Sequence, residues 1–222
     1  MTRVSILLLA LTGGLAVLAA GCGTVSSVRA LRKGQSALGV GLGGPVAHVA
    51  GMDIPLPYTV ARYRYGVNDK SSIYAGGHLM VAALGVAGLE AGWAWHPLTQ
   101  KKYRPAVSAS AGLAALVKSG DGHALFPQLD VTGSYLLGDR SLTYFGIQSM
   151  YQLADKPYAV FAPFVGEEVR LGSRVSLCAE AKWYAPTEKA SPRSVDYRIP
   201  IAGQGAVGFV LGVNYQFGGW YE

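Results

Sequence analysis

Residues 175–184 read VSLCAEAKWY, and this stretch decides between a helix and a strand. Its charged residues, Glu180 and Lys182, both occupy even-numbered positions. The odd-numbered positions hold apolar side chains: Val175, Leu177, Ala179, Ala181 and Trp183. Successive side chains of a β-strand point to opposite faces, so a strand collects all five apolar residues on one face. A helix would scatter Glu180 and Lys182 over its surface. The stretch therefore predicts a strand.

The same period of two recurs along the chain. In residues 207–217 large apolar side chains again occupy alternate positions, and Phe217 is the last of them. Strands long enough to cross a tilted bilayer are expected near residues 36–48, 56–66, 72–82, 86–96, 105–118, 125–137, 141–153, 158–171, 174–185 and 204–217. We expect an all-β protein, a single antiparallel up-and-down transmembrane β-barrel of about ten strands, with eight strands as the alternative.

One segment competes with this interpretation. Residues 76–98, GGHLMVAALGVAGLEAGWAWHPL, are long and apolar enough for a transmembrane helix. Glu90 near the middle of such a helix would cost roughly 2.5 to 3.5 kcal/mol, and Gly85, Gly88 and Gly92 weaken a helix further. Divided at residues 82–85, the segment becomes a hairpin with its larger apolar side chains on one face. The sequence favours the hairpin.

Composition indicates where the apolar face points. Charged residues make up 14% of the 222 residues, against about 25% in a typical soluble domain, and the chain holds 30 Gly and 13 Tyr. A soluble barrel needs charged side chains on its outside, whereas the non-apolar face here is mostly Gly, Ser, Ala and Gln. The net charge of +6 is scattered and forms no stripe of the kind that nucleic acid requires. We expect the apolar face to contact lipid.

The predicted connections differ in length between the two ends. One set, VNDKS, HPLTQKKYR, LGDRS and LGSR, is mostly short; the other includes AGMDIPLP, KSGDGHALFP and the long residues 184–203. Short periplasmic turns and longer outer loops are typical of outer-membrane barrels. An even number of strands also places the start of the first strand and the end of the last strand on the same, periplasmic side.

The start of the chain predicts export. A basic MTR is followed by the apolar VSILLLALTGGLAVL and by LAAGC, with small residues before Cys22. This stretch resembles the lipobox of bacterial lipoproteins, which implies that Cys22 is acylated, for example with palmitate; the alternative is ordinary cleavage after Ala20. We expect a signal peptide over 1–21, a lipidated amino terminus and tether over 22–35, and the barrel over 36–222. The lipid anchor would lie on the periplasmic side of the bacterial outer membrane. Cys178 is the second of two cysteines, so no disulfide framework is expected.

The end of the last predicted strand carries a second resemblance. Gly212, Tyr215 and Phe217 resemble the carboxy-terminal signal of outer-membrane barrels, which implies the barrel-assembly machinery as a partner. An edge strand with aromatic residues on its lipid face is a template for backbone pairing.

The inward-facing positions of the predicted strands hold a balanced set of charges. Buried ions are expensive unless they are paired, so these residues predict an interior polar network of ion pairs rather than an ion-selective ring. A small barrel is filled by its own side chains. The expected network comprises Arg62, Arg64, His78, Glu90, Asp130, Glu168, Arg170, Glu180 and Lys182. No metal site and no cofactor is expected.

Candidate enzyme sites are weak. His78 and Glu90 would lie opposite each other in the hairpin with Ser110 level on the next strand, but a hydrolase triad needs His in the middle. The predicted outer rim holds His48, Asp53, Asp121, His123 and Asp196, residue types that omptin-type outer-membrane proteases use, without a matching local motif. GVGLGG at residues 39–44 has the spacing of a nucleotide-binding loop, but Pro45 follows instead of a helix.

These observations predict a non-enzymatic, lipid-anchored outer-membrane barrel with a structural, surface-interaction or assembly role. The alternatives are a small pore, or a membrane-embedded enzyme that modifies lipid A or cleaves peptides. Expected partners are outer-membrane lipids, lipopolysaccharide and a protein at the outer loops, with the loop over residues 186–203 as the main contact surface. No nucleic acid is expected.

Overall fold

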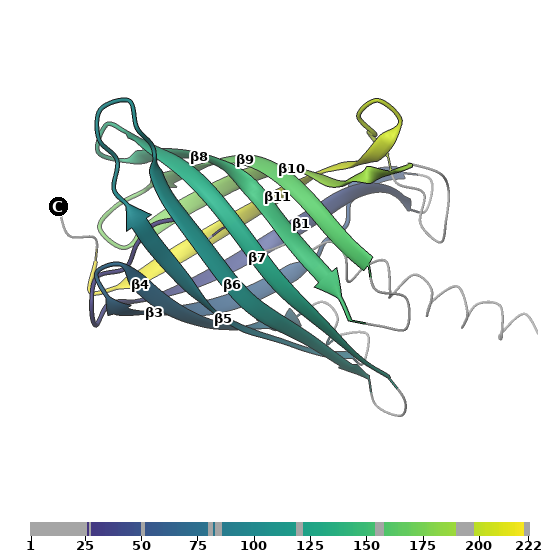
Figure 1. Ribbon diagram of the computed structural model, residues 1–222, viewed down its shortest axis with the longest axis horizontal. Coiled ribbons are helices and arrows are strands. Elements are labelled where there is room, and N and C mark those ends of the chain that lie inside the picture. Colours follow the sequence, from purple (N-terminus) through teal and green to yellow (C-terminus); the bar gives the residue numbers. More distant parts are fainter. Residues whose placement is uncertain are drawn as a thin grey trace, which may run out of the picture.

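Antiparallel strands form a closed barrel, and the computed structural model describes residues 26, 28–49, 52–79, 82, 86–118, 122–153, 158–189 and 198–219 (Figure 1). The strands are β1 (Ser36–Val49), β2 (Met52–Pro55), β3 (Thr59–Asn68), β4 (Ser71–His78), β5 (Val86–Leu98), β6 (Ala106–Lys118), β7 (Gly122–Leu137), β8 (Ser141–Gln152), β9 (Tyr158–Arg170), β10 (Val175–Lys189) and β11 (Gln204–Phe217).

Each barrel strand pairs with its neighbour in sequence, and β11 closes the barrel on β1. The wall has ten strands, and the short β2 is an extra strand on the end of β1. Ser36 pairs with Phe217, so the barrel starts and finishes at one end. We call this the turn end; it also holds the connections 69–70, 99–105, 138–140 and 171–174. The opposite end is the loop end.

The predicted strands are confirmed, with differences at the loop end. β4 stops at His78 rather than near residue 82, and β3 starts at Thr59 rather than near residue 56. Residues 52–55, expected in a loop, form β2 because their backbone pairs with the end of β1. β7 starts at Gly122, so the connection from β6 is shorter than expected from composition. Polar and glycine-rich sequence does not prevent β6 and β7 from pairing as far as Lys118 and Gly122.

Residues 76–78 and 86–98 lie in two paired strands, and the alternative of one helix over residues 76–98 is wrong. β4 and β5 pair antiparallel from Ser71 with Trp95 to Gly77 with Leu89. Leu89 is 66% exposed on the outer face, whereas Glu90 beside it is 4% exposed on the inner face. Across the described ranges, no helix has the length and apolar character needed to cross a membrane.

The two faces of the wall have opposite character. The outer face carries exposed apolar side chains on every barrel strand, for example Leu42, Ile73, Leu129, Val165 and Leu211. The inner face carries buried polar and charged groups together with buried aromatic residues. The distribution of apolar and polar side chains between the outside and the inside is thus the reverse of that in a soluble protein.

Part of the segment expected to be a tether lies inside the barrel. Val28 and Leu31 are buried, and Val28 packs on Leu142, Tyr144 and Phe164 of the inner wall. The backbone N–H of Ser26 donates to Glu180 on β10. From there the chain descends to the turn end, where Gly34 and Gln35 exchange backbone hydrogen bonds with Gly66. We call residues 26 and 28–35 the inner segment.

Candidate functional site

The lumen of the barrel holds most of the residues that the sequence singled out. Toward the loop end, Arg62 Nε donates to Glu90 Oε1 at 2.6 Å, and the guanidinium lies 4.5 Å from the ring centre of Tyr74. His78 Nε2 lies 3.7 Å from Glu90 Oε2, and Tyr58 OH lies 2.6 Å from His78 Nδ1. These side chains are almost fully buried. They form one connected group, which we call the upper cluster.

A second group lies at mid-height. Lys182 Nζ is 3.0 Å from Glu180 Oε2 and donates to Gln148 Oε1 at 3.3 Å. Glu180 Oε1 accepts hydrogen bonds from Tyr144 OH, at 2.9 Å, and from the Ser26 backbone. Lys182 is 1% exposed, so these partners stabilise its ammonium group in the absence of water.

Near the turn end the inner segment completes a third group. Arg29 Nε lies 2.9 Å from Glu168 Oε1, which also accepts a hydrogen bond from Ser176 Oγ at 2.7 Å. Arg64 Nη1 donates to the backbone oxygen of Arg29 at 3.2 Å. Arg170 lines a cavity at the same end. Asp130, by contrast, accepts from Ser110 Oγ at 2.9 Å between the upper and middle groups.

Glycines let these partners reach across an intervening strand. Arg62 on β3 pairs with Gly76 on β4, and Gly76 pairs with Glu90 on β5, so the ion pair spans three strands. A Cβ at Gly76 would stand 2.7 Å from both the Ala61 carbonyl and Glu90 Oε1. Tyr144 and Glu180 are likewise separated by Gly166. The absence of a side chain in the middle strand is what permits the contact.

The hydrolase arrangement considered from the sequence is not formed. Gly76, rather than His78, is the partner of Glu90 in the ladder. Ser110 donates to Asp130 and therefore lies in a different contact from His78 and Glu90. Histidine does occupy the middle of a chain, between Tyr58 and Glu90, but the three side chains are 2–4% exposed. That burial suits a structural network.

The residues expected at the outer rim are only partly described. His48 Nδ1 lies 2.6 Å from Asp53 Oδ1, and Arg198 Nε lies 3.4 Å from the same oxygen. These side chains are 38–54% exposed, at the loop end. His123 is exposed on β7, and Asp121 and Asp196 lie outside the described residues. Over the described ranges, no three His, Cys, Asp or Glu side chains gather closely enough to hold a metal ion.

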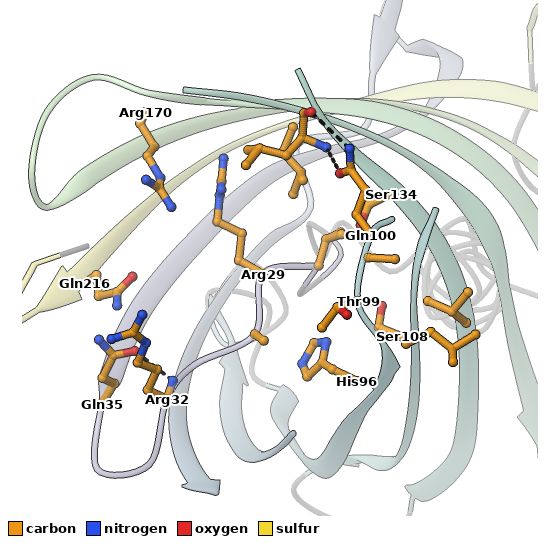
Figure 2. A pocket seen from close by; sticks show the side chains of 17 residues that line it. Arg29, Arg32, Gln35, His96, Thr99, Gln100, Ser108, Ser134, Arg170 and Gln216 are labelled. Atoms are coloured by element: carbon orange, nitrogen blue, oxygen red, sulfur yellow. Dashed lines mark hydrogen bonds between the residues drawn. The ribbon is translucent and has the colours of Figure 1, made fainter. Parts of the chain in front are cut away.

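A cavity of about 300 Å³ lies at the turn end, between the inner segment and the wall (Figure 2). Arg170, Gln216, Gln35 and Arg32 lie on one side in this view, and Gln100, Ser134, Thr99, His96 and Ser108 lie on the other, with Arg29 between them. Apolar side chains, including Val28, Leu136 and Leu142, complete the lining.

Two residues that carry lumen contacts were not identified from the sequence. Arg29 precedes the first strand, where periodicity says nothing about an interior position. Tyr58 belongs to the expected strand 56–66 and shares the parity of Arg62 and Arg64, so the alternation could have identified it. Glu167 was also missed: it projects from β9 on the opposite face to Glu168, near the turn end, and accepts hydrogen bonds from Ser141 and Thr143. Two successive acidic residues in a strand must face opposite sides, and this pattern could have identified it.

The two terminal signals differ in what can be seen of them. Cys22 lies outside the described residues. Tyr215 and Phe217 lie on the outer face of β11, with ring centres 5.1 Å apart, and Gly212 faces inward opposite Cys178. Cys178 itself is a buried thiol that accepts a hydrogen bond from Asn214.

No protein-family model matches the chain, and no curated protein matches it in sequence. Solved structures with a similar fold include the translocator domain of the autotransporter NalP from Neisseria meningitidis, at 10% identity and a TM-score of 0.46 over 84% of this chain and 90% of that one. OmpT, an outer membrane protein of Vibrio cholerae, has 13% identity and a TM-score of 0.37; the match covers 72% of this chain and 56% of that one. The outer membrane channel DcaP of Acinetobacter baumannii gives 13% and 0.34 over 85% and 61%. This chain thus spans about half the length of the Vibrio protein.

Proposed function

We propose that the protein is an outer-membrane barrel with a closed interior, which acts through its surface as a structural, interaction or assembly-partner protein. The outer face supports the membrane location. It is apolar along the barrel strands and becomes aromatic toward the turn end, where Tyr65, Trp95, Tyr135 and Phe217 gather. Trp93 and Trp95 stack with ring centres 6.4 Å apart. Aromatic girdles at the membrane–water boundary are typical of outer-membrane barrels.

The turn end also supports an orientation toward the periplasm. Its connections carry exposed cationic residues that outnumber Asp69 and Asp139: Lys70, Lys101, Lys102, Arg104, Arg140 and Arg174. Cationic side chains just outside an aromatic girdle are attracted by the anionic headgroups of the inner leaflet. Outer-membrane lipids and lipopolysaccharide are accordingly the first partners of the two membrane faces in this proposal.

The observation that carries the closed interior is the inner segment on the charged wall. Arg29 pairs with Glu168, the Ser26 backbone binds Glu180, and Leu31 is 1% exposed. A lumen of ten strands has little room, and here the chain fills part of it. Ion pairs in contact with a segment of the chain favour a plug over a permeation path.

Planar-bilayer recording of the purified full-length protein tests this proposal. We expect no discrete conductance steps, with a known porin as the positive control in the same membrane. Regular single-channel steps from the intact protein would overturn the closed interior and favour the small pore. The partner surface is a separate part of the proposal, and we place it at the loop end, in residues 186–203.

The proposed lipid anchor must satisfy the position of Ser26. Cys22 is four residues earlier, and four residues span at most about 14 Å. Residues 28–35 run from the lumen contact between Ser26 and Glu180 to the turn end. An acyl anchor in the inner leaflet, at the turn end, would therefore require the inner segment to leave the lumen. Mass spectrometry of the mature amino terminus would show whether Cys22 carries acyl chains.

An enzyme is the second candidate, and the exposed contact between His48 and Asp53 is the observation that favours it. A histidine oriented by a carboxylate can serve as a general base. Substituting His48 and His123 separately, followed by analysis of lipid A composition and of surface proteolysis, tests this candidate. Unchanged products in both variants would eliminate it.

A further inference from the structure

An acidic side chain lies on the outer, apolar face of the barrel wall near the turn end. Glu167 occupies an outward-facing position of β9, shortly before that strand ends at Arg170, and it is partly exposed. From β3 to β9 it is the only Asp, Glu, Lys or Arg at an outward-facing position whose side chain the structure describes. Its neighbours on the outer face of β9, Val165 and Val169, are 53% and 38% exposed. A carboxylate in such apolar surroundings is stabilised by a cation.

Two hydroxyl groups of β8 hold this carboxylate in one orientation. Ser141 Oγ donates to Oε1 of Glu167, and Thr143 Oγ1 donates to Oε2 at 2.5 Å. The two oxygens of a carboxylate offer about four acceptor sites, so about two remain after these bonds. In the described part of the chain, Glu167 forms no ion pair. The fixed carboxylate can therefore accept further hydrogen bonds from a cation outside the chain.

The surroundings of Glu167 are those of a membrane boundary. In the ladder Glu167 pairs with Ala179 on β10, which is exposed and too short to cover the carboxylate. On the other side it pairs with Thr143, and Thr143 pairs with Tyr135 of the aromatic residues at the turn end. The connections beyond these residues carry the exposed cations of the turn end. One fixed carboxylate beside a basic rim is complementary to a headgroup that contains both an ammonium and a phosphate group.

We propose that Glu167, oriented by Ser141 and Thr143, binds the ammonium group of a phosphatidylethanolamine headgroup at the turn end of the barrel. A primary ammonium has three N–H donors, as in lysine, whereas the trimethylammonium group of phosphatidylcholine has none. The phosphate lies toward the basic connections, and the acyl chains lie along Val165 and Phe145. The inference deepens the proposed function and rests on its membrane location, because it names one lipid for one place on the outer face.

Native mass spectrometry of the delipidated full-length protein in a non-ionic detergent tests this site. The protein is titrated with phosphatidylethanolamine, phosphatidylcholine and phosphatidylglycerol that have the same acyl chains. We expect the first phosphatidylethanolamine to bind at least about fivefold more tightly than either other lipid. Glu167→Gln should weaken its binding about fivefold or more, as expected for the loss of a charge-assisted hydrogen bond at a partly exposed position. Heat-modifiable gel mobility verifies that the variant is folded.

Asp139→Asn is the matched control, because Asp139 is an exposed acid in the 138–140 connection, outside the strands. It should keep the preference for phosphatidylethanolamine. Equal loss of the preference in Asp139→Asn and Glu167→Gln would indicate general attraction to negative charge at the turn end and overturn the site. Equal binding of the three lipids, or a preference that survives Glu167→Gln, would overturn it too. A dimer of the delipidated protein that Glu167→Gln dissociates would assign this surface to a second copy of the chain, and the lipid site would be refuted.

Insertion into vesicles of pure phosphatidylcholine tests the membrane location separately. The apolar outer face does not depend on Glu167, so the unmodified protein and Glu167→Gln should both insert and give the heat-modifiable band. Failure to insert into any vesicle would refute the membrane location. Insertion without a preference for phosphatidylethanolamine would refute only the headgroup site.

Discussion

Removing Glu90 should destabilise the barrel strongly because it leaves Arg62 buried without its counter-charge. The Arg62 side chain is 11% exposed and that of Glu90 is 1% exposed, with Nε and Oε1 2.6 Å apart. In Glu90→Gln the shape of the side chain is retained and the charge is lost. Tyr74 keeps its ring against the guanidinium, so the packing of Arg62 changes little.

The expected magnitude follows from the burial of this pair. Breaking a buried ion pair by removing one partner costs about 3–5 kcal/mol, which lowers the folding equilibrium constant by roughly 100-fold to several thousand-fold. Replacing both partners is often nearly neutral. We therefore expect Arg62→Met and Glu90→Gln each to be costly, and the double variant to recover about 2 kcal/mol or more relative to the sum of the two.

Equilibrium unfolding in urea with phospholipid vesicles, followed by tryptophan fluorescence and heat-modifiable mobility, measures these free energies. Asp69→Asn is the control, since Asp69 lies exposed at the turn end and its loss should change stability by less than about 0.5 kcal/mol. The reasoning would be refuted if Arg62→Met and Glu90→Gln each lowered the free energy of unfolding by less than about 1 kcal/mol and the double variant lowered it by their sum. Such a result would mean that water in the lumen screens both charges.

Other consequences of the structure can be tested separately. Gly66→Val should expel the inner segment from the lumen, because a Cβ at this position would collide with the Arg32 carbonyl. The thiol introduced by Leu31→Cys should react with maleimide in the Gly66→Val background and stay protected when Gly66 is intact. A spin label at Leu211, which is 64% exposed, should be relaxed by bilayer-dissolved oxygen and not by an aqueous reagent, and the opposite result would contradict the lipid-facing assignment. Tyr215→Ala with Phe217→Ala should slow insertion by the barrel-assembly machinery without lowering the unfolding free energy by more than about 2 kcal/mol; normal insertion kinetics would remove the assembly signal.

The sequence by itself determined the barrel wall. Alternation with a period of two identifies the strands, and it also fixes which side chains share a face, as at Leu89 and Glu90. The ends of the strands at the loop end were harder to place. β2 exists because the backbone of Met52–Pro55 finds a partner on β1, and composition does not encode that pairing.

Only the tertiary structure decided the contents of the lumen. Which charges meet depends on register, since a shift of one residue between strands moves every partner. Arg62 reaches Glu90 because Gly76 happens to lie between them in the ladder. Arg29 and Leu31 enter the lumen because the closed wall offers them Glu168 and an apolar surface, and a segment without repeating pattern carries no sign of this. A period along one strand is local, whereas contacts across a closed barrel depend on every strand at once.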